Sequence, residues 1–326
     1  MKRREFILAL GGAVAWPLAA RAQQPAKIYR IGVLETVSPD SNAKNIEALI
    51  RGLRDLGYVE NQNYLLEYRS ADGDAGRFPA LADELVRLRV DVIVTRGTPS
   101  ARAAKSATET IPIVMAAIGD PLGTGVVASL ARPGGNVTGL SAFVTELAGK
   151  RVELLKELRP GNSIAAFFAS MGNPVVPPQW EETSRAAQSL GIEMSLLDVR
   201  SREDIPGAFE AAVARGAESL LFSIDGLIQE NRQLIADLGA KHRLLTIYPS
   251  REFVEAGGLM AYGVSYPDLY FRSAFLIDKI FRGANPGDLP VEQPTKLEFI
   301  VNLKAAKAIG LTVPPLLIAR ADEVIE

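Results

Sequence analysis

Residues 90–121, VDVIVTRGTPSARAAKSATETIPIVMAAIGDP, decide the fold class of this chain. Val92–Val94 is a short β-branched run, as expected of a strand buried on both faces, and Ile111–Met115 is a second apolar run. Between them, Gly97 ends the first run and the Ala-rich segment 101–108 predicts a helix. Strand, helix and strand in this order form a βαβ unit, whose crossover is almost always right-handed.

The turn before this helix is predicted to hold an anion. Thr98 supplies an N-cap oxygen, and Pro99 follows at the first helical position. The amides of Ser100 and Ala101 would then be free at a helix N-terminus, where the helix dipole favours a carboxylate. We therefore expect Thr98, Ser100 and Ala101 to contact a ligand carboxylate. The alternative, that Thr98 only caps its own helix, stays open.

The same alternation of strands and helices extends over the rest of the chain, which indicates parallel sheets covered on both faces. No period of 20 to 50 residues repeats, so a solenoid is excluded. Apolar runs and glycine stops predict the following segments: a polar loop at Glu35–Asn42, helices at Asn45–Leu56, Val126–Leu130, Trp180–Leu190 and Leu227–Ala240, a long helix after Tyr266-Pro267, and a strand at Phe299–Leu303.

Residues 1–22 are expected to be an export signal. Lys2, Arg3 and Arg4 form a basic start, Phe6–Ala20 is mostly apolar, and Ala20-Arg21-Ala22 is a cleavage pattern. The stretch RREFI is similar to the twin-arginine export motif. An uncleaved anchor is the alternative, but the apolar run is shorter than the roughly 20 residues that a spanning helix needs. We expect a periplasmic protein that is not inserted in the membrane after cleavage.

Composition excludes several classes of function. The 326 residues carry a formal net charge of −2, which argues against a nucleic-acid binder with a basic face. There is no cysteine, so thiol catalysis and thiolate metal sites are excluded. The single histidine, His242, lies between Lys241 and Arg243 at a predicted helix end, which favours a dipole role over catalysis. No cofactor, metal or nucleotide is expected.

Three separated segments resemble one protein family. SLARPGGNVTGLS (129–141), EFVEAGGLMAYGVSY (252–266) and the final stretch from Leu289 to Glu326 look like the exported substrate-binding proteins of ABC transporters, tryptophan/tyrosine type. The resemblance covers nearly the whole chain after the signal.

The resemblance implies an α/β fold of the type 1 periplasmic-binding-protein class. Two Rossmann-like lobes with parallel sheets would be joined by three hinge crossovers, and would close on a small molecule in the cleft between them. Lobe one would comprise 28–139 plus 267–290, and lobe two 140–266 plus 295–326. The expected partners are the small-molecule ligand and a permease and an ATPase encoded separately.

Parallel sheets bind ligands beyond the carboxyl ends of their strands, and this rule nominates the site residues. The candidates are Glu35, Ser38, Arg96, Thr98, Ser100, Ala101, Ile118, Asp120, Ala169, Ser170, Asn173, Ser223, Asp225, Tyr248 and Tyr262. Asp120 and Asp225 are candidates for a ligand amine, although each could simply form a turn. Tyr248 and Tyr262 would stack on an aromatic ligand, although strand tyrosines commonly pack in the core.

Three functions remain open at this point. The resemblance favours a binding protein for import of a carboxylate-bearing molecule, such as an aromatic or branched amino acid. A sensory module that reports a ligand to a membrane receptor would have the same two-lobed form. An enzyme on this architecture is disfavoured, because no nucleophile or phosphate-loop motif occurs.

Overall fold

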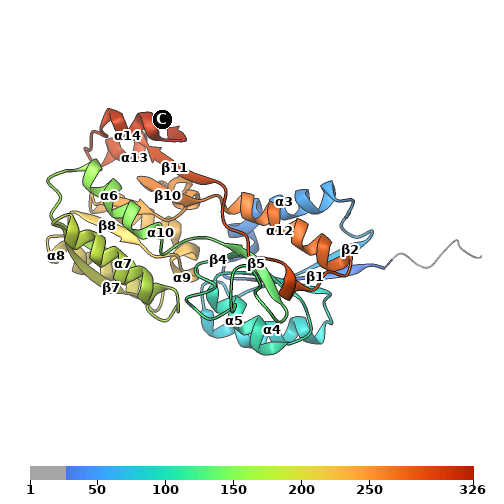
Figure 1. The fold of residues 1–326 in the computed structure, drawn as a ribbon. Helices are drawn as coiled ribbons and strands as arrows, with labels where there is room; N and C mark the ends of the chain where they lie inside the picture. The colour runs from blue at the N-terminus through green and yellow to red at the C-terminus, as the bar shows by residue number, and fades with distance from the viewer. Residues whose placement is uncertain (1–26) are drawn as a thin grey trace, which may run out of the picture.

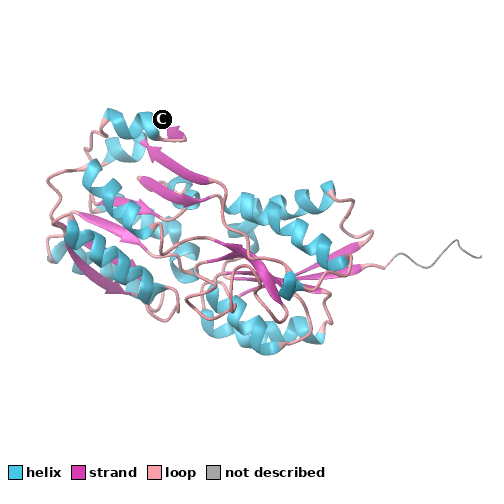
Figure 2. Ribbon diagram, viewed as in Figure 1, coloured by secondary structure: helices cyan, strands magenta, loops and turns pink. Residues whose placement is uncertain are grey.

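The computed structural model describes residues 27–326, so the expected signal segment 1–22 lies outside the described residues. Two lobes lie side by side, each built on one β-sheet with helices on both faces (Figures 1 and 2). The α/β architecture with parallel sheets in two lobes, predicted from the sequence, is confirmed. No helix among residues 27–326 is long and apolar enough to span a membrane.

The sheet of lobe one has the strand order β2-β1-β3-β4-β5, with all neighbours parallel. Its strands are β1 Tyr29–Glu35, β2 Tyr64–Ser70, β3 Val92–Arg96, β4 Ile113–Ile118 and β5 Val137–Ser141. Every residue of β3, β4 and β5 is buried, as the continuous apolar runs predict for strands covered on both faces.

Four main helices cover this sheet. On one face α3 (Pro39–Asp55) packs against α12 (Tyr266–Phe281), and on the other α4 (Phe78–Arg87) packs against α5 (Thr98–Ala107) (Figure 1). The short 3₁₀ turns are η1 Ala75–Arg77 and η2 Pro286–Asp288. Thus α12, far away in sequence, completes lobe one.

The sheet of lobe two has the order β12-β11-β10-β9-β8-β6-β7. Its strands are β6 Ile164–Ala169, β7 Glu193–Asp198, β8 Ser219–Phe222, β9 Leu245–Tyr248, β10 Met260–Val264, β11 Leu297–Asn302 and β12 Glu323–Ile325. Its helices are α6 Ala148–Leu158, α7 Val176–Ser189, α8 Asp204–Ala214, α9 Gly226–Glu230, α10 Arg232–Lys241, α11 Arg251–Glu255, α13 Leu303–Ala308 and α14 Pro315–Arg320.

The chain passes between the lobes three times, after β5, after β10 and before β11. β10 ends at the gap between the lobes, and the chain returns to the same edge after α12. β11 must therefore run away from the gap, and it pairs antiparallel with β10. The sequence predicts only parallel pairs, and the antiparallel pair of β10 and β11 corrects that prediction at this edge of lobe two.

Four sequence-based boundaries are wrong for local reasons. The expected loop at Glu35–Asn42 contains the start of α3, because Ser38 is an N-cap and Pro39 follows it. The expected helix at Val126–Leu130 is an irregular segment of bends, since the amides of Val126 and Val127 both donate to the carbonyl of Pro121. α7 begins at Val176 rather than at Trp180, because prolines are tolerated in a first turn. The expected helix Leu227–Ala240 is broken at Asn231 into α9 and α10.

The close contact between α3 and α12 helps to hold lobe one together. A Cβ atom on Gly52 would lie 2.6 Å from the carbonyl oxygen of Phe271 and 2.8 Å from Cβ of Ala274. Gly52→Val should therefore separate the helices and cost about 1–3 kcal/mol of unfolding free energy, measured by urea denaturation. Gly207→Ala, in α8 with open space around it, is the control and should be neutral or stabilising. Equal stability of Gly52→Val and wild type would contradict this packing.

Candidate functional site

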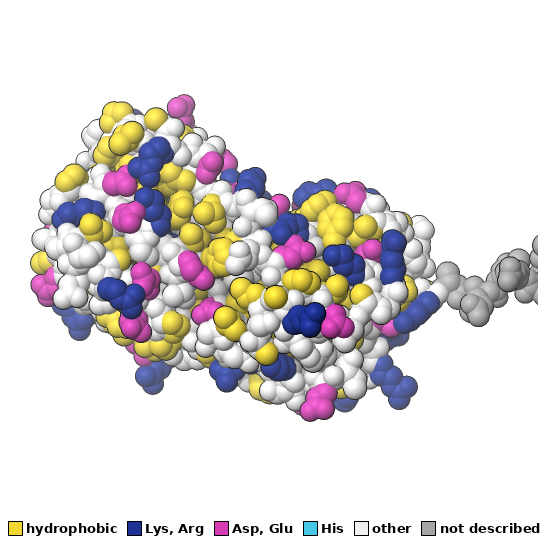
Figure 3. All heavy atoms as spheres, viewed as in Figure 1, with side chains coloured by type: hydrophobic (Ala, Val, Ile, Leu, Met, Phe, Trp, Pro, Cys, Tyr) yellow, Lys and Arg dark blue, Asp and Glu magenta, His cyan; other side chains and the backbone are white. Residues whose placement is uncertain are grey.

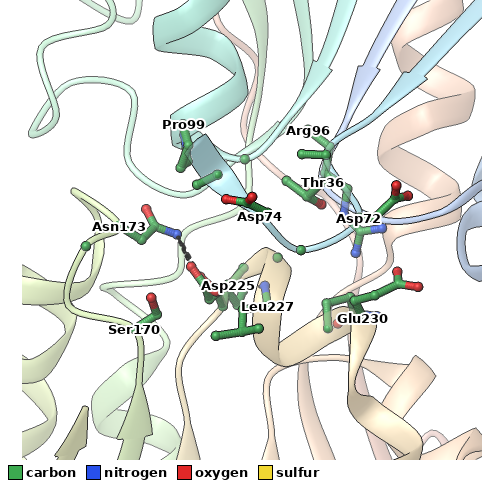
Figure 4. Close-up of a pocket in the computed structure, with 18 of the residues that line it drawn as sticks. Thr36, Asp72, Asp74, Arg96, Pro99, Ser170, Asn173, Asp225, Leu227 and Glu230 are labelled. Carbon is green, nitrogen blue, oxygen red and sulfur yellow. Dashed lines mark hydrogen bonds between the residues drawn. The ribbon is translucent and has the colours of Figure 1, made fainter. Parts of the chain in front are cut away.

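A cavity of about 610 Å³ lies between the two lobes, within the size range of small-molecule sites. Its walls are the loops that follow the carboxyl ends of the strands in both sheets, as expected for facing parallel sheets. We call it the interlobe cavity (Figure 4). The residues that line it are Thr36, Ala71–Gly76, Phe78, Arg96, Gly97, Pro99, Ala117, Gly119, Ala142, Ser170, Gly172, Asn173, Arg200–Arg202, Ile224–Leu227, Gln229–Asn231 and Tyr266.

Arg96, the last residue of β3, is the buried cation of the lobe-one wall and is 5% exposed. Its guanidinium lies 4.2 Å from the ring centroid of Tyr266 and 3.6 Å from a carboxylate oxygen of Glu252 in lobe two. It also donates a 3.1 Å hydrogen bond to Asn42. Since a guanidinium has five N–H donors in a fixed fork, Arg96 can still bind a carboxylate.

Behind Arg96, Glu35 is fully buried at the end of β1. Burial raises the pKa of the Glu35 carboxyl, while the charge of Arg96 and a hydrogen bond from the Tyr270 hydroxyl oppose the rise. Glu35 does not line the interlobe cavity. Its position makes it a partner of Arg96 and of α12 rather than a group that meets a ligand.

Asp225 and Asn173 form the polar wall of lobe two (Figure 4). Asp225 caps α9 by accepting a 2.8 Å hydrogen bond from the amide of Leu227, and its other oxygen accepts a 3.0 Å bond from the Asn173 amide. Burial raises the pKa of the Asp225 carboxyl, although these hydrogen bonds oppose the rise. Within residues 27–326 no Lys, Arg or His lies within 4.0 Å of this carboxylate. The cavity therefore offers a negative charge that a cationic group can neutralise.

The lobes touch each other around the cavity, so the structure is a closed arrangement. The Glu230 carboxylate of lobe two accepts a 3.0 Å hydrogen bond from the backbone amide of Ser38 in lobe one. Lys44 and Glu255 form a 2.8 Å ion pair between the lobes. A ligand in the cavity would be enclosed from both sides.

The structure brings together four of the residues nominated from the sequence. Arg96, Ser170, Asn173 and Asp225 line the interlobe cavity. The remaining eleven do not line it, and their surroundings explain why.

The predicted anion turn differs from expectation. Gly97, not Thr98, is the N-cap residue of α5, and Thr98 makes no capping hydrogen bond. The Ala101 amide is not free, because it donates a 3.3 Å bond to the Gly97 carbonyl. The Ser100 hydroxyl donates to the carbonyl of Arg96 and lies 3.0 Å from that of Gly97. Thr98, Ser100 and Ala101 are all buried away from the cavity, whereas Gly97 and Pro99 line it.

The other nominated residues have structural surroundings. Ile118 and Ala169 are core residues, and Ser223 is fully buried. Asp120 caps its own turn by accepting a 2.8 Å bond from the Gly123 amide. Tyr248 is fully buried and stacks against Phe222 and Phe253.

Two further nominated residues lie at contacts that join parts of the chain. Tyr262 packs edge-on against Phe299 in lobe two, and its carbonyl accepts a 2.8 Å bond from Arg151. Ser38 caps α3 and contacts Glu230 of the other lobe. Neither side chain faces the interlobe cavity.

The residues nominated from the sequence leave out two loops, most of α9 and two aromatic residues of the cavity, Phe78 and Tyr266. The loop after β2 (71–76) and the loop after β7 (200–202) follow the same carboxyl-end rule and could have been nominated by it. Tyr266 is predicted to lie just before the long helix, and no sequence signal points its ring at Arg96.

The described chain contains no cluster of three or more His, Cys, Asp or Glu side chains that could hold a metal ion. On the face shown in Figure 3, basic, acidic and apolar side chains are interspersed over both lobes. The interlobe cavity is thus the best-defined site, and its groups suit a small molecule with separate polar and apolar parts.

Comparisons with known proteins agree with this arrangement. A family model described as ABC transporter substrate binding protein matches residues 30–325. A tyrosine-binding protein of Clostridioides difficile is 27% identical over 285 residues, which are 87% of this chain and 82% of that protein.

Two solved structures are similar over almost their full length. An ABC domain from Streptococcus pneumonia in complex with L-Trp is 28% identical, with a TM-score of 0.85 over 92% of this chain and 100% of that one. A conserved domain protein from Vibrio cholerae is also 28% identical, with a TM-score of 0.85 over 91% and 100%. Since the family model spans almost all of the described residues, this chain belongs to the ABC transporter substrate-binding proteins and has their two-lobed type 1 fold.

Proposed function

We propose that the protein captures an aromatic amino acid in the interlobe cavity and delivers it to the permease of an ABC importer. The observation that supports this most directly is the partly buried carboxylate of Asp225, which faces the cavity without a cationic partner in the described chain. A ligand ammonium would supply the missing positive charge. The relatives named for tyrosine and for L-Trp support the choice of an amino acid.

The opposite wall supplies a group for the ligand carboxylate. Arg96 lines the cavity from lobe one, across from Asp225 of lobe two (Figure 4). Arg96 replaces the turn at Thr98–Ala101 as the proposed carboxylate partner, because Thr98, Ser100 and Ala101 do not line the interlobe cavity. The Ser100 hydroxyl and the Ala101 amide also bond to backbone carbonyls. An α-amino acid held in this way would touch both lobes, and its side chain would lie among Phe78, Pro99 and Leu227.

The proposal includes export to the periplasm, directed by residues 1–22, and a separate permease and ATPase. No bond is made or broken in this function, because binding and closure alone transfer the ligand. The test is titration calorimetry of the protein without residues 1–22, against L-Trp, L-Tyr, L-Phe and L-Leu. Saturable one-to-one binding of at least one aromatic member is expected, and no heat with any of them would overturn the ligand class.

Asp225→Asn should weaken amino acid binding by about 10- to 100-fold, since a hydrogen bond to a charged group contributes about 1.5–3 kcal/mol. The same variant should lose the preference for L-Trp over indole-3-propionate, which lacks the ammonium. Calorimetry with both ligands measures the two effects. Asp120→Asn is the matched control, because Asp120 lies outside the cavity and its capping oxygen is kept. An unchanged affinity of Asp225→Asn would remove Asp225 from the site.

Affinity should also depend on pH through Asp225. The pKa of its carboxyl in the ligand-free protein is raised, so it takes up a proton at a higher pH than an ordinary aspartate does. The ligand ammonium stays charged as the pH falls, and protonated Asp225 cannot pair with it. The dissociation constant should therefore rise as the pH falls through the raised pKa of Asp225, and this slope should be lost in Asp225→Asn. Parallel profiles for both proteins between pH 4 and 8 would contradict the assignment.

A further inference from the structure

We infer that the short helix α9 couples ligand binding to closure of the lobes: Asp225 at its start faces the interlobe cavity, and Glu230 at its end locks onto helix α3 of lobe one. This inference rests on the proposed function for its ligand. The lock consists of Glu230, Ser38 and Ser41, and we call it the latch.

The latch is a helix cap supplied by the opposite lobe. α3 has 17 residues, and its N-cap residue is Ser38. The Glu230 carboxylate accepts 3.0 Å hydrogen bonds from the Ser38 amide and the Ser38 hydroxyl, and a 3.4 Å bond from the Ser41 hydroxyl. A carboxylate at a helix N-terminus is favoured by the unpaired amides and by the helix dipole. These bonds exist only while the lobes are together.

Glu230 has no comparable role within its own lobe. It is the last residue of α9, where the negative end of the helix disfavours a carboxylate. Within residues 27–326 no Lys, Arg or His nitrogen lies within 4.0 Å of it. Its hydrogen bonds to side chains and to the backbone amide of Ser38 all reach into lobe one, so the benefit of a carboxylate here comes from the closed arrangement.

α9 packs closely against lobe one in the closed arrangement. A Cβ atom on Gly226 would lie 2.9 Å from Cβ of Thr36, and one on Gly73 would lie 3.3 Å from Cα of Leu227. α9 has five residues, about 7.5 Å of helix, between the cap Asp225 and Glu230. A ligand that fixes Asp225 therefore also fixes the carboxylate of the latch against α3.

The latch adds to affinity without contact between Ser38 or Ser41 and the ligand. Neither serine lines the interlobe cavity. If the binding-competent closed state is populated for only a fraction of the time, the apparent dissociation constant equals the intrinsic constant divided by that fraction. Loss of the latch lowers that fraction, and because it holds the lobes shut, the change should appear mainly in the dissociation rate.

The experiment is a double-mutant cycle on the protein without residues 1–22. One arm is Glu230→Gln, the second is Ser38→Ala with Ser41→Ala, and the third combines all three. Each of the first two should weaken the best-binding amino acid of the aromatic panel by about five- to fiftyfold, with a faster dissociation rate in stopped flow. The combined variant should be about as weak as the worse of the two, because both arms break the same contact.

Asn302→Ala is the matched control for loss of a helix cap. Asn302 caps α13 in lobe two, accepting a 2.9 Å bond from the Ala305 amide, and it lies outside the interlobe cavity. It should lower the urea midpoint as the serine variant does but leave affinity unchanged. A drop in affinity for Asn302→Ala equal to that of the serine variant would attribute the effect to stability and overturn the latch.

A readout without ligand separates the latch from the proposed function. By small-angle scattering, the ligand-free latch variants should have a larger radius of gyration than the ligand-free wild type. If wild type binds no member of the panel, the proposed ligand class fails, and scattering alone then decides on the latch. If wild type binds and all three arms keep its affinity and radius, the latch is overturned. Strictly additive losses would also overturn it, since Glu230 would then act on the ligand directly.

Discussion

The closed structure depends on the contacts of one buried group, the guanidinium of Arg96. It lies where lobe one, lobe two and the α12 crossover meet, beside Glu252, over the ring of Tyr266 and in front of Glu35. Removing a charge of this kind from water is costly unless opposite charges and hydrogen bonds surround it. Glu35 and Asn42 offset part of this cost within lobe one, and Glu252 of lobe two contributes only when the lobes are together.

A second constraint is the direction of the strands. The five strands of the lobe-one sheet and β6–β10 of lobe two all end at the gap, and their loops therefore form one cavity. A ligand in that cavity meets loops rather than strands, so its chemistry can change with the loops while both sheets stay the same. This explains how one architecture can be matched over its whole length at 28% identity.

Much of the fold was predictable because buried parallel strands leave continuous apolar runs in the sequence. The direction of β11 was not, because it depends on the edge at which the chain returns to lobe two. For the site, the carboxyl-end rule placed Arg96 and Asp225 correctly at the cavity wall. The rule could not distinguish a hydroxyl that is available to a ligand from one that already bonds to the backbone. Ser100 illustrates this, since its hydroxyl bonds to carbonyls one turn earlier. Contacts between lobes, such as that of Glu230 with Ser38, leave no local signal at all.

Lobe one is also discontinuous in sequence, and this affects how the molecule is assembled. Ile31, Val92 and Val114 of its sheet share one apolar cluster with Leu269 and Ile277 of α12. During synthesis that sheet face is covered by α3 alone until α12, which ends at Phe281, has left the ribosome, by which time β6–β10 of lobe two are complete. Lobe two in turn lacks β11 and β12 until the last residues are made. Neither lobe is complete before the other is nearly so, and the two lobes mature as one interdependent unit rather than as successive domains.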